Sequence, residues 1–239
     1  MNILKRFYKI YLLTIILSTA LIYANDIFYA DIYVEGSNKT KLAFTHKNEV
    51  KHIADKTILT HFYYTPNGSL HVKEEVVLLK GQPFSNTLES YGVNEYAKME
   101  FRDSKVDISF RHDDMKKSVT RRVKTPLVFG PSQQNMLNEH FDEILNGEAI
   151  NVYALASEFL KMVKLKVQRI KGSQYEQPGT MVLEMRPRST VINWFVGKTY
   201  YVVDIQSGRV LEMHGFSTLR QKIDGKWEYV NMDFYYTYE

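Results

Sequence analysis

Hydrophobic and polar residues alternate in short segments along most of the chain, and turn-forming pairs interrupt the alternation about every ten residues. This spacing is typical of an antiparallel β-meander. The clearest hairpin turns at residues 65–68, where Pro66 and Gly68 fit a type I turn closed by a glycine bulge. Further hairpin turns are expected at Asp103-Ser104, at Ser207-Gly208 and at Asp224-Gly225.

The apolar residues of the first hairpin predict how its two strands pair. Pairing Phe62 with Val72 sets two apolar side chains opposite each other, whereas a shift by one residue would set Phe62 against Lys73. The same register pairs Tyr64 with Leu70. Because a one-residue slip moves every side chain to the other face, the buried face is expected to select this register.

Two helices are expected to interrupt the strands. Residues 132–146 carry an apolar stripe at helical spacing, with Ser132 as the N-cap and Gly147 as the stop. Residues 189–196 form a shorter, strongly apolar segment that is expected to pack on a sheet face or to close a cavity. The expected fold class is therefore α+β and predominantly antiparallel β, a curved meander sheet or half-barrel with two capping helices.

The first 24 residues are expected to be an export signal and not part of this fold. Basic residues at positions 5, 6 and 9 precede an almost entirely apolar run at residues 10–24, and Ala24 stands at its exit. This is the layout of a secretory signal. Cleavage is expected after Ala24, or alternatively after Ala20. A retained membrane anchor is the other interpretation, although the run of about 15 residues is shorter than the roughly 20 that a spanning helix needs.

Cleavage would leave one β-rich domain at residues 25–239, exported to the periplasm or secreted. Without residues 1–24 the chain has 28 basic and 27 acidic residues, so the basic excess nearly disappears. A nucleic-acid-binding protein would usually keep such an excess, and no nucleic-acid partner is expected. The chain contains no cysteine, which excludes disulfides and lipid attachment at an N-terminal cysteine.

Two stretches match a known arrangement of exported domains. In residues 129–155 a helix ending in Leu-x-Gly precedes a strand, and the strand from Tyr200 to Asp204 turns at Gly208 into a closing meander through Leu211. In this order of elements the chain resembles the half-barrel proteins of the LolA/LolB lipoprotein-carrier type and the DUF3108-like exported domains. The resemblance implies a curved sheet whose helices cap a hydrophobic concave face. The carriers bind acyl chains of lipoproteins, and no motif here transfers that ligand.

The chain has no catalytic signature that would identify a reaction. It lacks Gly-x-Ser-x-Gly, His-Glu-x-x-His and a phosphate-binding glycine loop, and without cysteine it has no thiol chemistry. His61 and His71 are expected on the outer face as surface residues, so no metal or cofactor is expected. A hydrolase without a known motif would need His140 to meet carboxylates such as Glu139 and Glu143. A solvated helix face is the ordinary interpretation of those acids.

Two basic stretches are expected to be solvated strand exteriors or, alternatively, surfaces for peripheral contact with anionic lipid. They consist of Lys116, Lys117, Arg121, Arg122 and Lys124 in one, and of Lys161, Lys164, Lys166, Arg169 and Lys171 in the other.

The sequence therefore predicts a non-enzymatic exported envelope protein that binds a lipid or other apolar ligand on the concave face of a curved sheet. The alternative is an adhesion or assembly protein that binds an envelope protein partner through a sheet edge or a basic face. Residue by residue, the ordinary alternative to ligand contact is a place in the core. The residues expected to line or gate the concave face are Phe62, Tyr64, Phe141, Trp194 and Phe195.

Overall fold

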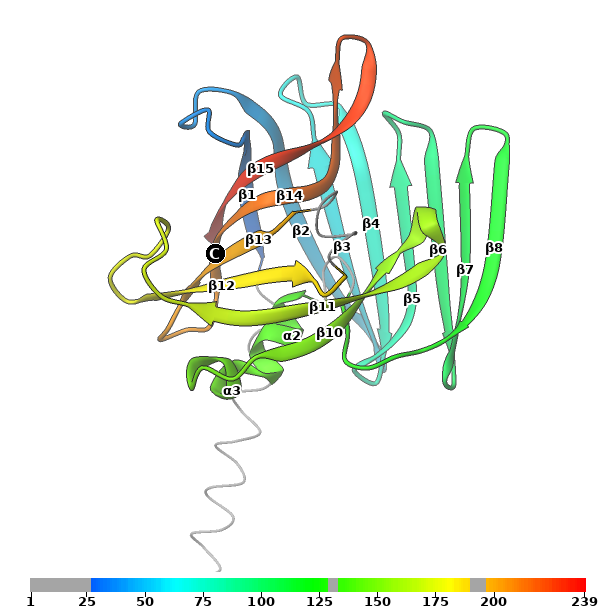
Figure 1. Ribbon diagram of the computed structural model, residues 1–239. Helices are drawn as coiled ribbons and strands as arrows, with labels where there is room; N and C mark the ends of the chain where they lie inside the picture. Colours follow the sequence, from blue (N-terminus) through cyan, green and yellow to red (C-terminus); the bar gives the residue numbers. More distant parts are fainter. Residues whose placement is uncertain (1–26, 129–132, 190–196) are drawn as a thin grey trace, which may run out of the picture.

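The computed structural model describes residues 27–128, 133–189 and 197–239. The strands in these ranges form one 15-stranded sheet, in which successive strands are neighbours except β8 and β9, which lie at its two ends. The first strand, β1, also pairs with the last, β15 (Figure 1). All pairs are antiparallel except β9 with β10, which run parallel. The expected predominantly antiparallel fold with short helices is confirmed.

The elements of the first half are β1 (Phe28–Val34), β2 (Leu42–Ile53), β3 (Lys56–Tyr64), β4 (Leu70–Leu79), β5 (Gln82–Ser90), β6 (Glu95–Arg102), β7 (Lys105–His112) and β8 (Met115–Arg122). Those of the second half are β9 (Leu127–Val128), α2 (Gln133–Glu139), α3 (Phe141–Leu145), β10 (Ile150–Ala156), the 3-10 helix η3 (Ser157–Phe159), β11 (Lys161–Ile170), β12 (Thr180–Pro187), β13 (Thr199–Asp204), β14 (Val210–Ile223) and β15 (Lys226–Tyr238).

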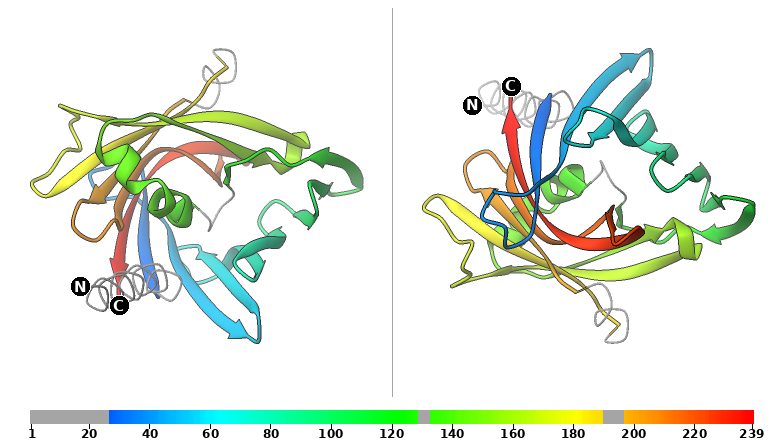
Figure 2. Two further views of the ribbon diagram at one scale, coloured as in Figure 1. Left: turned by 90° about the horizontal axis from the view of Figure 1, so that it is seen from below. Right: turned by 90° about the horizontal axis from the view of Figure 1, so that it is seen from above.

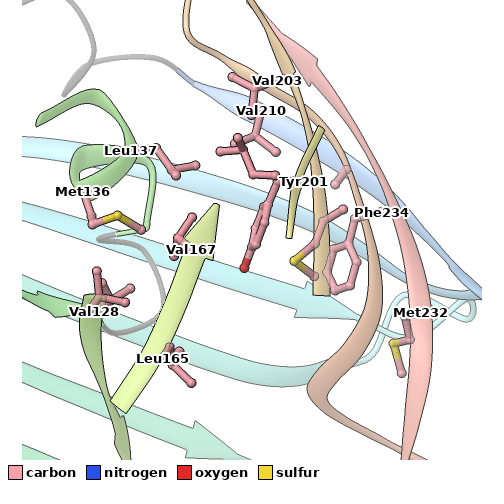
Figure 3. Close-up of a cluster of buried hydrophobic side chains, with 14 of the residues drawn as sticks. Val128, Met136, Leu137, Leu165, Val167, Tyr201, Val203, Val210, Met232 and Phe234 are labelled. Carbon is pink, nitrogen blue, oxygen red and sulfur yellow. The ribbon is translucent and has the colours of Figure 1, made fainter. Parts of the chain in front are cut away.

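The sheet curls until its two halves face each other as two walls, with α2 and α3 between them at one end (Figure 2). Met136 and Leu137 of α2 are buried against the second wall, which contributes Val167 and Tyr201 (Figure 3). The phenol of Tyr201 donates a hydrogen bond to Oε1 of Gln133 at 2.9 Å. The apolar concave face and the helices thus share one core.

The sheet is not closed, because β8 and β9 at its two ends are not hydrogen-bonded to each other. We call the line where these ends meet the seam. Side chains cross the seam: Met162 packs near Met99 and Ile108 in one cluster, and Nε–H of Arg121 donates to the carbonyl of Leu160 at 3.2 Å. The walls therefore touch through side chains where a closed barrel would have a backbone ladder.

An ionic contact also joins the two halves of the sheet. Arg220 of β14 lies 3.0 Å from Glu95 of β6 and 2.9 Å from Glu158 of η3. The phenol of Tyr229 on β15 donates to the same carboxylate of Glu158. Because Arg220 is mostly shielded from solvent, this contact is screened less than a surface ion pair.

The expected helix at 132–146 is divided into α2 and α3 in the structure. His140 separates them with φ −113° and ψ 18°, outside helical geometry, and no side chain caps α3 at this residue. Ser132, the expected N-cap, lies outside the described residues, as does most of the second expected helix at 189–196. In the described ranges, we find no helix with the length and hydropathy to span a bilayer.

The predicted register of the first hairpin was wrong beyond its first pair. The turn forms as expected, and Tyr64 pairs with Leu70. A bulge at His71 then shifts the strands, so that Tyr63 faces Val72 and Phe62 faces Lys73. Because two residues of β4 oppose one of β3 there, the odd-numbered residues of β3 turn to the buried face. The two-residue turns at Asp103-Ser104 and Asp224-Gly225 form as expected.

Replacing Gly215 in β14 is expected to destabilise the fold strongly. Its φ is +107°, and a Cβ would lie 2.4 Å from the carbonyl oxygen of Lys198. Gly215→Ala should therefore cost about 1–3 kcal/mol for overpacking beyond the cost of the backbone conformation. Gly68→Ala is the control, because Gly68 also has positive φ but no atom within 4 Å of an added Cβ. Equal losses in the free energy of unfolding by urea would contradict this account.

Candidate functional site

Polar side chains gather on the concave face of β2 to β5, where a core would ordinarily be apolar. We call this group the interior polar cluster. Five of its members are buried, with exposed fractions from 0% to 8%, and the sixth, Tyr63, packs against the main core. The cluster consists of His46, Asn48, His61, Tyr63, Glu74 and Asn86.

The strand register places these residues together. Asn48 of β2 and Glu74 of β4 both pair with His61 of β3, one on each side. His46 pairs with Tyr63 one row away. Because side chains two residues apart on a strand share a face, the two rows are neighbours on the concave surface.

Hydrogen bonds satisfy only part of the interior polar cluster. Nε2 of His46 lies 2.8 Å from Nδ1 of His61, so one ring donates and the other accepts. Nδ2 of Asn86 donates to Oε1 of Glu74 at 2.9 Å. Nδ1 of His46 and Oδ1 of Asn86 have no hydrogen-bond partner among the described residues. A buried polar atom without a partner costs about 1–3 kcal/mol, so these two atoms favour an additional group at this place.

Aromatic rings cover the histidines of the cluster. The ring of Phe28 lies 5.3 Å from that of His46 and 5.7 Å from that of His61. The ring of Tyr236 lies 5.7 Å from that of Phe28, and the ring of Tyr63 lies 4.7 Å from that of His46. The cluster therefore combines a few polar atoms with an aromatic surround, the usual composition of a small-molecule site.

Burial controls the charges in the cluster. Burial lowers the pKa of His61 to about 3 and holds the pKa of His46 well below its usual value, with a further lowering by His61. Burial raises the pKa of Glu74 to about 7, against a smaller lowering by the bond from Asn86. The two imidazoles are therefore neutral at pH 7, while Glu74 is partly protonated. The cluster is a hydrogen-bonding surface with little net charge.

In the part of the chain that the structure describes, no three His, Asp or Glu side chains are placed to hold a metal ion. The expectation that His61 and His71 are solvated surface residues was nevertheless wrong, since both are buried. His71 stacks on Phe44 at 4.9 Å and lies outside the cluster.

A histidine does meet two carboxylates, but at His214 rather than at His140. Nδ1 of His214 lies 2.8 Å from Asp233, and Nε2 lies 2.9 Å from Glu212. The ring of Tyr175 stacks on the imidazole at 4.0 Å. Both nitrogens are engaged and the ring is covered, so this group lacks the free nitrogen that a general base needs. His140 bonds Glu143 within its own helix turn at 2.9 Å.

The structure separates the residues that the sequence predicts for the concave face. Phe62 and Tyr64 lie on the convex face, because the bulge at His71 turns His61 and Tyr63 inward, and their own rings stack at 6.3 Å. Phe141 opens α3 and packs against the main core near the turn at Gly208. Trp194 and Phe195 lie outside the described residues.

A hollow of about 440 Å³ opens at β6, β7 and β8, away from the interior polar cluster. Of the residues predicted to contact a ligand, the three that the structure describes, Phe62, Tyr64 and Phe141, do not line it. Its lining residues are Tyr96, Ser109, Phe110, Arg111, Lys116, Lys117 and Ser118.

Comparisons with known proteins give a fold likeness only. No protein-family model matches the chain, and no curated protein matches it. A β-barrel-like protein of the domain of unknown function DUF1849 from Brucella abortus is similar over 89% of this chain and 94% of that one, with 8% identity and a TM-score of 0.41. A porin-like protein from Bacteroides uniformis is similar over 90% and 96%, with 11% identity and a TM-score of 0.26. The description of the fold therefore rests on its own strand order.

Acid is expected to destabilise the protein through its buried histidines. An unfolded histidine has a pKa near 6.5, and burial lowers that of His61 to about 3, so the unfolded chain binds more protons between these values. The free energy of unfolding should fall as the pH drops from 6.5 towards 3. When unfolding by urea is measured across this pH range, the free energy of unfolding of His61→Gln should fall less steeply than that of the wild-type protein. His52→Gln, at the exposed end of β2, should keep the wild-type slope.

Glu74 is expected to act in the opposite direction. Its pKa is raised from 4.5 to about 7, so the folded chain binds more protons in this window and stability declines as the pH rises through it. Glu74→Gln should remove this decline in urea unfolding between pH 4.5 and 7. Glu75→Gln, the next residue on the convex face, is the matched control. The account would be wrong if both variants kept the wild-type profile.

Proposed function

We propose that the chain is an exported, non-enzymatic protein that binds a lipid or other apolar ligand with an uncharged polar head group on its concave face. The observation that carries the proposal is the interior polar cluster, which holds two unpartnered polar atoms within an aromatic surround. An ordinary core would place apolar side chains there.

The cluster selects the chemistry of the head group. Oδ1 of Asn86 accepts hydrogen bonds, and the partly protonated Glu74 both donates and accepts them. A hydroxyl or amide group matches this set, because it also donates and accepts. An anionic head group would lose its hydration with no positive charge in the cluster to offset the cost. The apolar part of the ligand would lie against Phe28 and Tyr236.

The seam supports entry of such a ligand. The walls meet there through side chains, so they separate without breaking backbone ladder bonds. The aliphatic packing around Met99 and Ile108 would be replaced by contact with the apolar ligand. The burial of apolar surface at the seam would thus still contribute, in part, to the stability of the complex.

The alternative is an adhesion or assembly function, and one observation favours it. β8 is an edge strand, paired with β7 on one side only, and nearly all of its residues are exposed. Edge strands add a strand from a partner when they are uncharged and flat, whereas lysine and arginine on the edge oppose this pairing. Lys116, Lys117, Arg121 and Arg122 all lie on β8, which makes this function the second candidate.

Native mass spectrometry of protein recovered from the envelope of expressing cells tests the proposal. We expect a bound mass in the size range of a lipid, and a neutral amphiphile such as a monoacylglycerol should rebind after delipidation. His46→Phe should weaken this binding about tenfold, as loss of one well-placed hydrogen bond implies. His71→Phe is the matched control, because it replaces an equally buried histidine outside the cluster.

Circular dichroism checks that both variants fold, and the wild-type protein is informative even if His46→Phe does not. A wild-type protein that carries no ligand and binds no neutral amphiphile would refute the ligand function. A clean apo mass with a stoichiometric protein partner would support the alternative.

A further inference from the structure

The hollow at β6 to β8 has a definite arrangement of donors. We call it the basic hollow. Tyr96, Arg111 and Lys116 are consecutive cross-strand partners and share one face of the sheet. Ser109 and Ser118 are partners in the next row of the same face, two residues along each strand. Ala97 and Phe110 point to the buried side, so the donors belong to the convex face.

The cations of the basic hollow differ from three lysines elsewhere on this wall. On β2, β4 and β6, Lys47, Lys73 and Lys98 each lie within 3.6 Å of a glutamate two residues further along the strand. Within residues 27–128, 133–189 and 197–239, Arg111 and Lys116 make no ion pair of this kind. The positive charges of Arg111 and Lys116 are therefore not offset by an ion pair in the part of the chain that the structure describes.

The acidic group in the same cross-strand row is turned to another partner. Glu89 pairs with Tyr96 across β5 and β6, and its carboxylate accepts a hydrogen bond from the phenol of Tyr91 at 2.9 Å. The guanidinium of Arg111 lies 5.6 Å from the centre of the Tyr96 ring, which positions it at the side of the hollow. The small side chains of Ser109 and Ser118 leave room beside Arg111 and Lys116.

We propose that the basic hollow binds a phosphate-bearing ligand. Phosphate presents several acceptor oxygens, which match the guanidinium of Arg111, the ammonium of Lys116 and the hydroxyl of Ser118. The hydroxyl of Ser109 donates to the carbonyl of Lys98 at 3.4 Å. The hollow of about 440 Å³ exceeds the size of inorganic phosphate, so it has room for a phosphate ester with its attached group. The ester is either a soluble metabolite or the head group of a lipid. This site is separate from the concave face and does not depend on the function proposed above.

Protection of an edge strand explains only part of this arrangement. Charges on β8 would oppose strand addition wherever they lay along that strand. Arg111 lies on β7, which is paired on both sides, and the serine row has no role in protecting an edge. The hollow and its hydroxyls therefore need a separate explanation, and an anionic ligand provides one.

Calorimetric titration with glycerol 3-phosphate, together with co-sedimentation with vesicles, tests the proposal. The vesicles contain phosphatidylglycerol in phosphatidylcholine, or phosphatidylcholine alone. The test variant is Arg111→Gln with Lys116→Gln. The control variant is Lys105→Gln with Arg122→Gln, a cross-strand pair at the other end of the same two strands. Both variants remove one arginine and one lysine from exposed positions, so they change the net charge equally.

We expect the test variant to weaken binding at least about tenfold, since charged hydrogen bonds are lost, and the control to change it less than about threefold. Binding of glycerol 3-phosphate would identify a soluble ester as the source, and binding of phosphatidylglycerol vesicles without it would identify a lipid head group. Equal weakening in both variants would indicate diffuse attraction and overturn the site. Absence of binding to either probe would overturn it as well.

Discussion

The pairing of the first strand with the last is the constraint on which the rest of the structure depends. Seven residue pairs, from Phe28 with Tyr238 to Val34 with Met232, join β1 to β15. Each half of the chain by itself would be a meander with one further open edge. Joined at β1 and β15, the halves become one sheet that is long enough to curl and to enclose a face. Phe28 and Tyr236, which cover the interior polar cluster, lie on these two strands.

The distribution of charge follows from that enclosure. On the convex face, lysines and glutamates two residues apart neutralise each other on β2, β4 and β6. On the concave face, the histidines are neutral and Glu74 is held near its protonated form, since a charge there would lose its hydration. On the convex face of these strands, opposite charges are therefore offset by ion pairs. On the concave face, the polar groups instead lose most of their charge.

Local features of the fold could be predicted from the sequence, and features that depend on tertiary packing could not. Two-residue turns such as Asp103-Ser104 are encoded by their own residues and form as expected. The bulge at His71 is not encoded locally in this way, because either hairpin register gives apolar contacts. In the folded chain the His71 ring lies inward and packs against Phe44 and Trp227. The pairing of the first strand with the last has no local signal in the sequence from which it could be predicted.

The candidate site was missed for a related reason. The alternation of the sequence predicts an outer-face position for His61, because polar side chains in alternating strands usually face outward, and it singles out Glu74 for no role. Their neighbours Leu59 and Val76, which are buried partners on the same two strands, were the available signal, since they share a face with His61 and Glu74. Likewise, Glu212, His214 and Asp233 converge only because β14 pairs with β15 in one particular register.

The unpaired seam gives the molecule a freedom that a barrel of hydrogen-bonded strands does not have. In a closed barrel, strand number and shear together fix the circumference, and the volume inside is fixed with it. Here β8 and β9 end the sheet without pairing, and mainly side chains such as Arg121 and Met162 connect the walls at that line. The circumference is consequently set by packing, and the sheet can coil more or less tightly around contents of different size without a change in any strand register.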